Sequence, residues 1–278
     1  MVDSESDFSH VSKFILDFQL HVLQPLILKA PACQSSSSML VASVVRQLPE
    51  SRDRLGVSGS GSGNGNGNGE AWKWRKTGLQ VLDTEMGQDD WLIAFAPITL
   101  ISTGGFLATN FFHNRESTGD IDYLLEPQWA HDNDIKKPLR DAMTRAARHL
   151  GFIDDWLNDE VAFFVPDNHR ELLFEKAEEQ NIVLWEGANL RVLAVPLEWA
   201  LERKLRRIHN SRRHIKRGSD ISDVVAMLKH LRTQAGGPLN REYVRTMSIC
   251  SFEMPPDKHT MNEIAAAYRD KYNEEAFL

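Results

Sequence analysis

Two short apolar segments joined by a glycine pair constrain the fold of this chain more than any other feature. The first runs from Trp91 to Leu100 and the second from Asp120 to Leu125, and Gly104 and Gly105 open an apolar helical stretch between them. Apolar runs of this length, bounded by turn residues, are typical of buried strands. The order predicts a strand, a glycine turn at a helix N-terminus and a second strand.

The chain beyond these segments continues to alternate between helical and strand patterns. A helical stripe ends at Gly151, and two strands are expected at residues 182–185 and 190–195. Pro196 is expected to begin the first of several C-terminal helices, and Ser219 to cap a later one. We therefore expect an α/β (α+β) fold, with a mixed sheet flanked by helices and a helical C-terminal part.

The N-terminal quarter has a different character. Residues 8–29 repeat apolar side chains at helical spacing and predict an amphipathic helix that docks on the main domain or on a protein partner. Residues 58–69 contain only Ser, Gly and Asn, a composition that predicts a flexible linker. The expected parts are a helical segment at 1–57, this linker, an α/β domain at 70–195 and a helical part at 196–278.

Composition and charge exclude several classes of protein. The net charge of −7 argues against a general nucleic-acid binder, so any such binding needs a local basic patch. Cys33 and Cys250 are too far apart in sequence to match a disulfide framework or a zinc motif. The acidic N-terminus is unlike a secretory signal, and no early apolar run is long enough to span a membrane. We expect a soluble, cytoplasmic protein without membrane association.

Two carboxylates in the second segment predict a metal site. Because side chains alternate along a strand, Asp120 and Asp122 are expected on one face, where they repel each other unless a cation lies between them. Oxygen ligands of this kind suit Mg²⁺ or Mn²⁺. The turn at Gly104 and Gly105 lets the backbone approach a phosphate, so the segment predicts a site for a nucleoside triphosphate and a divalent metal.

This arrangement resembles the nucleotidyltransferase superfamily with the polymerase-beta-like fold, whose signature is a glycine pair followed by an acidic–hydrophobic–acidic triplet. The closer likeness is to the nucleotidyltransferases of bacterial toxin and antitoxin systems, in which an Arg and a Ser or Thr precede the triplet. The matching residues are Gly104, Gly105, Arg115, Ser117 or Thr118, Asp120 and Asp122. The resemblance implies that residues 70–195 form a nucleotidyltransferase-like domain.

The resemblance also implies an activity. A metal-dependent enzyme of this kind transfers a nucleotidyl group from a triphosphate such as ATP to an acceptor, which the sequence leaves open as a small molecule, a protein or an RNA. Asp120, Asp122 and Lys204 would be the catalytic residues, and the glycines, Arg115, Ser117 and Thr118 would bind the nucleotide. The toxin and antitoxin branch has a lysine near the position of Lys204 and a later Arg and Asp cluster, which Arg217, Asp220 and Asp223 resemble.

Lys204 and Asn158 each carry two interpretations. Lys204 lies beside the apolar stripe of its helix, where a lysine either needs an anionic partner or extends its ammonium into water. Trp156 is expected to anchor a turn to the core, whereas Asn158, two residues later, is left open as a residue that orients the acceptor.

Two other functions remain open at this point. The candidates for a third catalytic carboxylate are Asp159, Glu160 and Glu186. Without one, the chain would be a non-catalytic scaffold or a regulatory binding protein of the same fold, because nothing would activate the acceptor hydroxyl. Alternatively, the basic segment at 203–217 would bind RNA phosphates, although such a run is usually a solvated helix end and loop.

Overall fold

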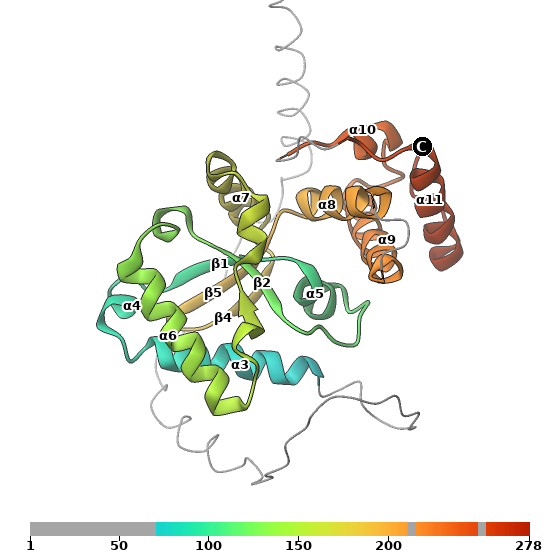
Figure 1. Ribbon diagram of the computed structural model, residues 1–278. Coiled ribbons are helices and arrows are strands. Elements are labelled where there is room, and N and C mark those ends of the chain that lie inside the picture. The colour runs from blue at the N-terminus through green and yellow to red at the C-terminus, as the bar shows by residue number, and fades with distance from the viewer. Residues whose placement is uncertain (1–70, 211–214, 250–253) are drawn as a thin grey trace, which may run out of the picture. The chain divides into compact units, whose positions relative to one another are not determined.

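The computed structural model describes residues 71–278 except 211–214 and 250–253 (Figure 1). They all belong to the second of two structural units, which spans Asn66–Leu278. The helix predicted at 8–29 and the linker predicted at 58–69 lie outside the described residues. None of the described helices is long and apolar enough to cross a membrane.

A five-stranded mixed sheet with the order β3-β2-β1-β5-β4 lies at the centre of this unit (Figure 1). β1 (Ile98–Ser102) pairs antiparallel with β2 (Ile121–Leu125) and parallel with β5 (Leu190–Ala194). β3 (Leu157–Asn158) is parallel to β2, and β4 (Val183–Glu186) is antiparallel to β5. The sheet is flanked by helices, so the mixed α/β architecture predicted from the sequence is confirmed.

The helices around the sheet are α3 (Ala71–Met86), α4 (Asp90–Ala94), α6 (Asn133–Leu150) and α7 (Asp167–Gln180). α3 and α6 pack against each other, and α6 buries an apolar stripe on one face. The carboxylate of Asp132 caps the start of α6, and Gly151 ends it in the left-handed conformation. The predicted stop at Gly151 is confirmed.

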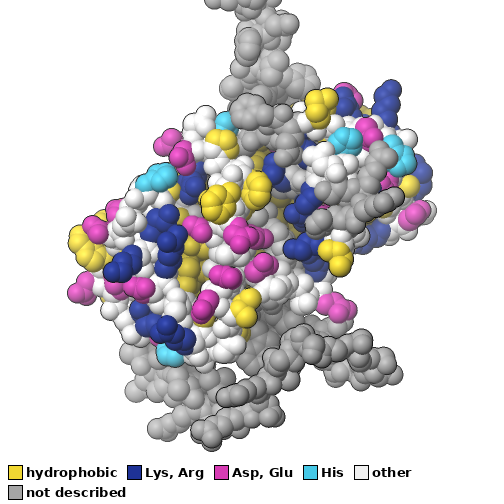
Figure 2. Space-filling view, viewed as in Figure 1, with side chains coloured by type: hydrophobic (Ala, Val, Ile, Leu, Met, Phe, Trp, Pro, Cys, Tyr) yellow, Lys and Arg dark blue, Asp and Glu magenta, His cyan; other side chains and the backbone are white. Residues whose placement is uncertain are grey.

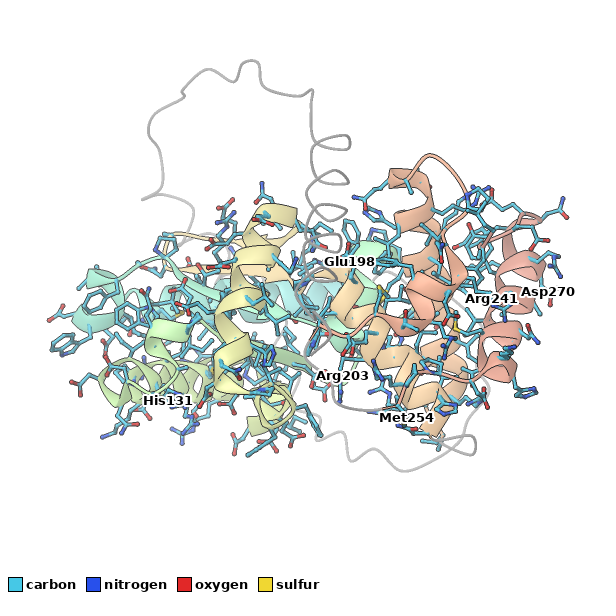
Figure 3. The ribbon with its side chains drawn as sticks, turned by 90° about the horizontal axis from the view of Figure 1, so that it is seen from above. His131, Glu198, Arg203, Arg241, Met254 and Asp270 are labelled. Carbon is cyan, nitrogen blue, oxygen red and sulfur yellow. The ribbon has the colours of Figure 1, made fainter. Side chains whose placement is uncertain are left out.

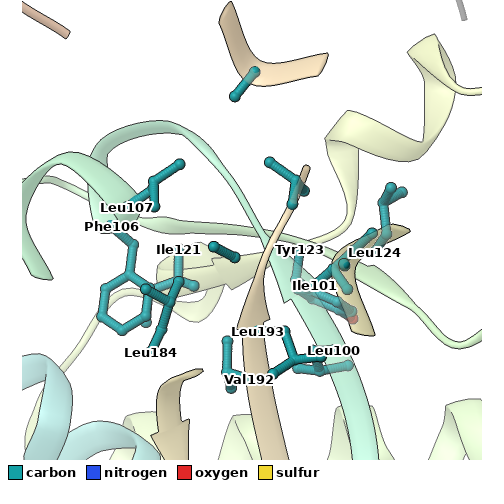
Figure 4. Close-up of a cluster of buried hydrophobic side chains, with 14 of the residues drawn as sticks. Leu100, Ile101, Phe106, Leu107, Ile121, Tyr123, Leu124, Leu184, Val192 and Leu193 are labelled. Carbon is teal, nitrogen blue, oxygen red and sulfur yellow. The ribbon is translucent and has the colours of Figure 1, made fainter. Parts of the chain in front are cut away.

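Side chains from both faces of the central strands fill the core (Figure 4). All five residues of β1 are buried, as expected for a central strand that is covered on both faces. The cluster drawn in Figure 4 includes Leu100, Ile101, Phe106, Leu107, Ile121, Tyr123, Leu124, Leu184, Val192 and Leu193.

Four helices form the C-terminal part: α8 (Leu197–Asn210), α9 (Arg217–Gln234), α10 (Arg241–Thr246) and α11 (Lys258–Tyr272). α8 packs on α9, and α11 contacts both. The predicted cap at Ser219 is wrong, because α9 begins two residues earlier. The Ser219 hydroxyl donates to the Lys216 carbonyl at 2.7 Å instead of accepting a backbone N–H.

The strand predicted at Trp91–Leu100 is also wrong in its first half. Residues 90–94 form the short helix α4, whose N-cap Asp89 accepts hydrogen bonds from the backbone N–H groups of Trp91 and Leu92 at 3.0 and 3.1 Å. β1 begins only at Ile98, after Pro97. A short apolar run does not distinguish a strand from a helix by periodicity, and here a capping residue decides the outcome.

Candidate functional site

The glycine turn after β1 lies directly against β2. Gly104 begins α5 (Gly104–Leu107) with φ +68°, and a Cβ on it would lie 2.3 Å from Asp122 Oδ2. A Cβ on Gly105 would lie 1.9 Å from Thr118 Oγ1. A side chain at either position would force Asp122 or Thr118 to shift, and Gly104 also has a backbone conformation that favours glycine.

Two hydrogen bonds connect the end of β1 and the turn to the same point on β2. The Ser102 hydroxyl donates to the Asp122 carbonyl at 2.8 Å, and the Thr103 backbone N–H reaches that carbonyl at 3.3 Å. Thr118, which faces Gly105, donates to the Asp120 carbonyl at 3.3 Å. The structure thus brings together Gly104, Gly105, Thr118, Asp120 and Asp122. Ser117, the alternative to Thr118, is exposed.

Asp120 and Asp122, which we call the acidic pair, lie close enough for the charge of Asp120 to act on Asp122. Burial raises the pKa of Asp122 above its ordinary value, and the negative charge of Asp120 raises it further. Glu160 acts in the same direction, whereas the positive charges of Lys216 and Lys204 oppose it. A cation near the two carboxylates would relieve this repulsion, as expected for metal ligands.

The third carboxylate has one candidate beside this pair. Asn158 on β3 is the register partner of Asp122, and Glu160 follows it at the start of η6 (Glu160–Phe164), which packs on β2. The backbone N–H of Glu160 donates to Asn158 Oδ1 at 3.2 Å. Glu160 is thus the predicted candidate that acts electrostatically on Asp122.

The other two candidates have different surroundings. Asp159 Oδ2 lies 3.6 Å from Arg140 Nη2, and Glu186 is on β4, at the opposite edge of the sheet from β3, with Arg191 as its neighbour. Across the described ranges, no three His, Cys, Asp or Glu side chains are placed to share a metal ion. Any metal here would take its remaining ligands from water or substrate.

Lys204 is buried on α8, and its anionic partners are in the chain itself. Its Nζ lies 2.6 Å from Asp223 Oδ2 and 3.2 Å from Asp220 Oδ1, both on α9. The alternative of a side chain that extends into water is therefore wrong. Burial alone would raise the pKa of Asp220, but hydrogen bonds and charges from Arg207 and Lys204 outweigh it and leave this pKa below its ordinary value.

Arg115 joins the same cluster from the loop that precedes β2. Its Nε donates to Asp223 Oδ1 at 2.8 Å, and Asn114 Nδ2 donates to that oxygen, also at 2.8 Å. Arg207 completes the cluster through Asp220. We call Lys204, Arg115, Arg207, Asp220 and Asp223 the ion cluster. It has one more cation than anions and anchors the loop that carries Thr118 and Asp120.

Two features of the ion cluster differ from the sequence-based expectation. Arg217, which was grouped with Asp220 and Asp223, instead donates to the Ile208 carbonyl and to Glu263. The contributions of Asn114 and Arg207 were not predicted. For Arg207 the available signal was its spacing: it lies three residues after Lys204, on an adjacent part of the α8 surface.

A family model described as a domain of unknown function, DUF7582, matches residues 104–275. The chain belongs to this family. The matched region of the DUF7582 protein starts at the glycine turn and includes the acidic pair and the ion cluster. No curated protein and no solved structure matches the chain.

Two exposed aromatic side chains of the DUF7582 domain lie on η6, the helix that begins at Glu160. On η6, Phe163 is 88% exposed and Phe164 60% exposed. The guanidinium carbon of Arg203 lies 5.7 Å from the centre of the Phe164 ring, and Figure 3 shows Arg203 where the elements around the sheet meet the C-terminal helices. Sequence reasoning did not single out these phenylalanines, since residues 161–165 resemble an ordinary apolar run.

Several cations of the basic segment at 203–217 are paired with acids in the part that the structure describes, which leaves out residues 211–214. Arg206 contacts Glu202, Arg207 contacts Asp220 and Arg217 contacts Glu263. On the face shown in Figure 2, basic side chains of the described residues gather in separate groups with acidic and apolar side chains between them. These pairings reduce the positive charge that the segment presents to RNA phosphates.

Proposed function

We propose that this DUF7582 protein binds a nucleoside triphosphate with Mg²⁺ or Mn²⁺ and transfers a nucleotidyl group to an acceptor, on a nucleotidyltransferase-like sheet. One observation carries the proposal: the glycine turn lies so close to the Asp122 carboxylate that a Cβ on Gly104 would be 2.3 Å from Asp122 Oδ2. A backbone that can approach a phosphate thus lies beside the carboxylates that would hold its metal.

The acidic pair fits a magnesium ion. Mg²⁺ is usually held by one or two protein carboxylates together with substrate phosphates and water, so Asp120 and Asp122 are sufficient ligands. The pKa of Asp122 is raised first by burial and then by the charge of Asp120, so a counter-charge would favour its ionised form. When bound, the metal would neutralise charge on the transferred phosphate.

Positive charge on the other side of the site comes from the ion cluster. The side chain of Arg115 is 20% exposed, and Asp223 orients its guanidinium. Lys204 is held between two aspartates, which favours an indirect role in which its charge supports Asp122. We therefore assign phosphate contact to Arg115 and positioning to Lys204.

Transfer also requires a general base, which accepts a proton, and a surface that binds the nucleobase. Glu160 is our candidate for the base: it would accept the proton of the acceptor hydroxyl as that oxygen bonds to the α-phosphorus and the bond to pyrophosphate breaks. The exposed rings of Phe163 and Phe164 offer stacking surfaces for the nucleobase, and Arg203 lies beside Phe164.

The first test is isothermal titration of ATP, GTP, CTP and UTP, with and without Mg²⁺. We expect binding that requires the metal and that disappears in the double variant Asp120→Asn, Asp122→Asn. The matched control is Asp154→Asn, Asp155→Asn, which neutralises two exposed carboxylates on η5 (Asp154–Trp156). If no nucleotide binds, the proposal fails and the non-catalytic scaffold becomes the better interpretation.

The second test separates binding from turnover. Triphosphates labelled at the α- or the γ-phosphate are incubated with small hydroxylated or amino compounds, protein and RNA. Transfer of the α-label alone, with release of pyrophosphate, supports the proposal. The Glu160→Gln variant should bind nucleotide but not transfer it, whereas Asp159→Asn should do both. Binding without transfer to any acceptor class would instead indicate a regulatory protein.

A further inference from the structure

A pocket opens on the face of β2 opposite Asp122. Tyr123 and Leu125 alternate with Asp122 along β2, so they point to the other face, where they line this pocket. The space between these side chains is about 290 Å³ when the open solvent at its mouth is included, and its enclosed part has room for about one water molecule, so a ligand would bind at the mouth. Lys136 and Arg140 from α6 and Arg170 from α7 complete its polar wall, next to Asp159.

The charges around this pocket are unbalanced. Three cationic side chains line it, with Asp159 as the one acid in the wall. Arg140 Nη2 lies 3.6 Å from Asp159 Oδ2, so these two charges offset each other. Lys136 and Arg170 are left as an excess of positive charge over a largely apolar floor of Leu125, Ala130 and Leu139.

Arg170 is the decisive residue because it is buried without adequate compensation. It is only 9% exposed, and its Nε has no hydrogen-bond partner among the described residues. The carboxylate nearest its guanidinium within this part of the chain is Asp167, at 3.9 Å from Nη2, and Asp167 is itself 73% exposed and shared with His131. A buried guanidinium is costly unless it is paired and hydrogen-bonded, so the site calls for an anion.

We propose that this pocket binds a small oxyanion, specifically a phosphate group, through Arg170, Lys136 and Arg140. Arginine presents a planar fork of donors that matches phosphate oxygens, and lysine adds a point charge. The phosphate is either the free ion or a group carried by a larger molecule that extends from the open mouth. The pocket does not depend on the proposed nucleotide site, since the two lie on opposite faces of β2.

The test measures binding of inorganic phosphate by titration calorimetry and by thermal melting, in metal-free buffer. The wild-type protein should bind phosphate and melt at a higher temperature as its concentration rises. Arg170→Met should reduce the affinity at least about 10-fold, as expected for the loss of a charge-assisted contact. The matched control is Lys137→Met, which removes an exposed cation next to Lys136 on α6.

Folding and location are checked separately. Without phosphate, Arg170→Met should melt no lower than the wild type, because an unpaired buried charge is replaced by an apolar side chain. Should this variant fail to fold, Lys136→Met provides the same comparison. Absence of phosphate binding by the wild type, or equal binding by the wild type and the pocket variants, would overturn the proposal.

Two comparisons distinguish this site from the nucleotide site and identify the source of the phosphate. The Arg170→Met variant should retain any metal-dependent nucleotide binding. The double variant Asp120→Asn, Asp122→Asn should retain phosphate binding. Loss of both activities in Arg170→Met would refute a separate site. Ribose 5-phosphate binding more tightly than the free ion would support a phosphate on a larger molecule, and the reverse order would support the free ion.

Discussion

Gly104 and Asp122 are in direct contact, although 17 positions of chain lie between them. Because Gly104 has a positive φ, its backbone and its missing side chain are both needed for this contact. The same contact brings the turn after β1 to the metal-binding face of the proposed site. It therefore provides the most direct way to test whether geometry at this point matters for binding.

Gly104→Ala should abolish metal-dependent nucleotide binding. Its methyl group would displace the Asp122 carboxylate, and the left-handed backbone would add about 1–2 kcal/mol of strain. Gly151→Ala is the control, because Gly151 has φ +67° but no atom within 4 Å of a Cβ. Titration calorimetry and urea unfolding should show similar backbone strain in both variants but loss of binding only in Gly104→Ala. Normal binding by Gly104→Ala would contradict the site.

Asp122→Asn should stabilise the metal-free protein at neutral pH. Burial, followed by the charge of Asp120, raises the pKa of Asp122, so its contribution to stability is present below the ordinary pKa of about 3.9 and is lost as the pH rises through the raised value. The melting temperature of the variant should exceed that of the wild type at pH 7, and the difference should close towards acid pH. Adding Mg²⁺ should also reduce the difference in melting temperature between the variant and the wild type. A difference that is independent of pH would argue against this explanation.

Asp223→Ala should destabilise the protein by about 3–5 kcal/mol, because it leaves the buried charge of Lys204 without its closest partner. Ser222→Ala, which removes an acceptor 3.2 Å from Asn114 Nδ2, should cost about 1 kcal/mol or less. Denaturant unfolding measures both. Equal losses in the two variants would show that the ion cluster contributes little beyond ordinary hydrogen bonds.

Phe164→Ala should weaken nucleotide binding by about 1–3 kcal/mol if the base stacks on this ring. Phe164→Tyr should restore it, since the ring face is kept. Trp91→Ala, which removes another exposed aromatic side chain, on α4, is the control and should bind as the wild type does. Titration calorimetry in the presence of Mg²⁺ measures the affinity of each variant for all four triphosphates. An unchanged affinity in Phe164→Ala would show that the nucleobase does not stack on Phe164.

Local pattern predicted much of the fold correctly. Turn residues and periodicity predicted strands at 182–185 and 190–195 and a helix that stops at Gly151. The structure has β4, β5 and the end of α6 at these positions. The pattern failed at Trp91, where a capping contact from Asp89 converts an apolar run into a short helix. For Lys204 an anionic partner was one of two alternatives left open by the sequence, and the identity of that partner as Asp220 and Asp223 was not predicted.

The sequence by itself determined the local chemistry of this protein: the glycine turn, the two closely spaced aspartates and the helical position of Lys204. Only the tertiary structure decided which distant groups meet. Arg115 contacts Asp223 across 108 positions of chain, and Asn158 lies beside Asp122 because β3 pairs with β2. Spacing governs neighbours within one helix or strand, whereas these contacts depend on how separate elements pack, which no local pattern specifies.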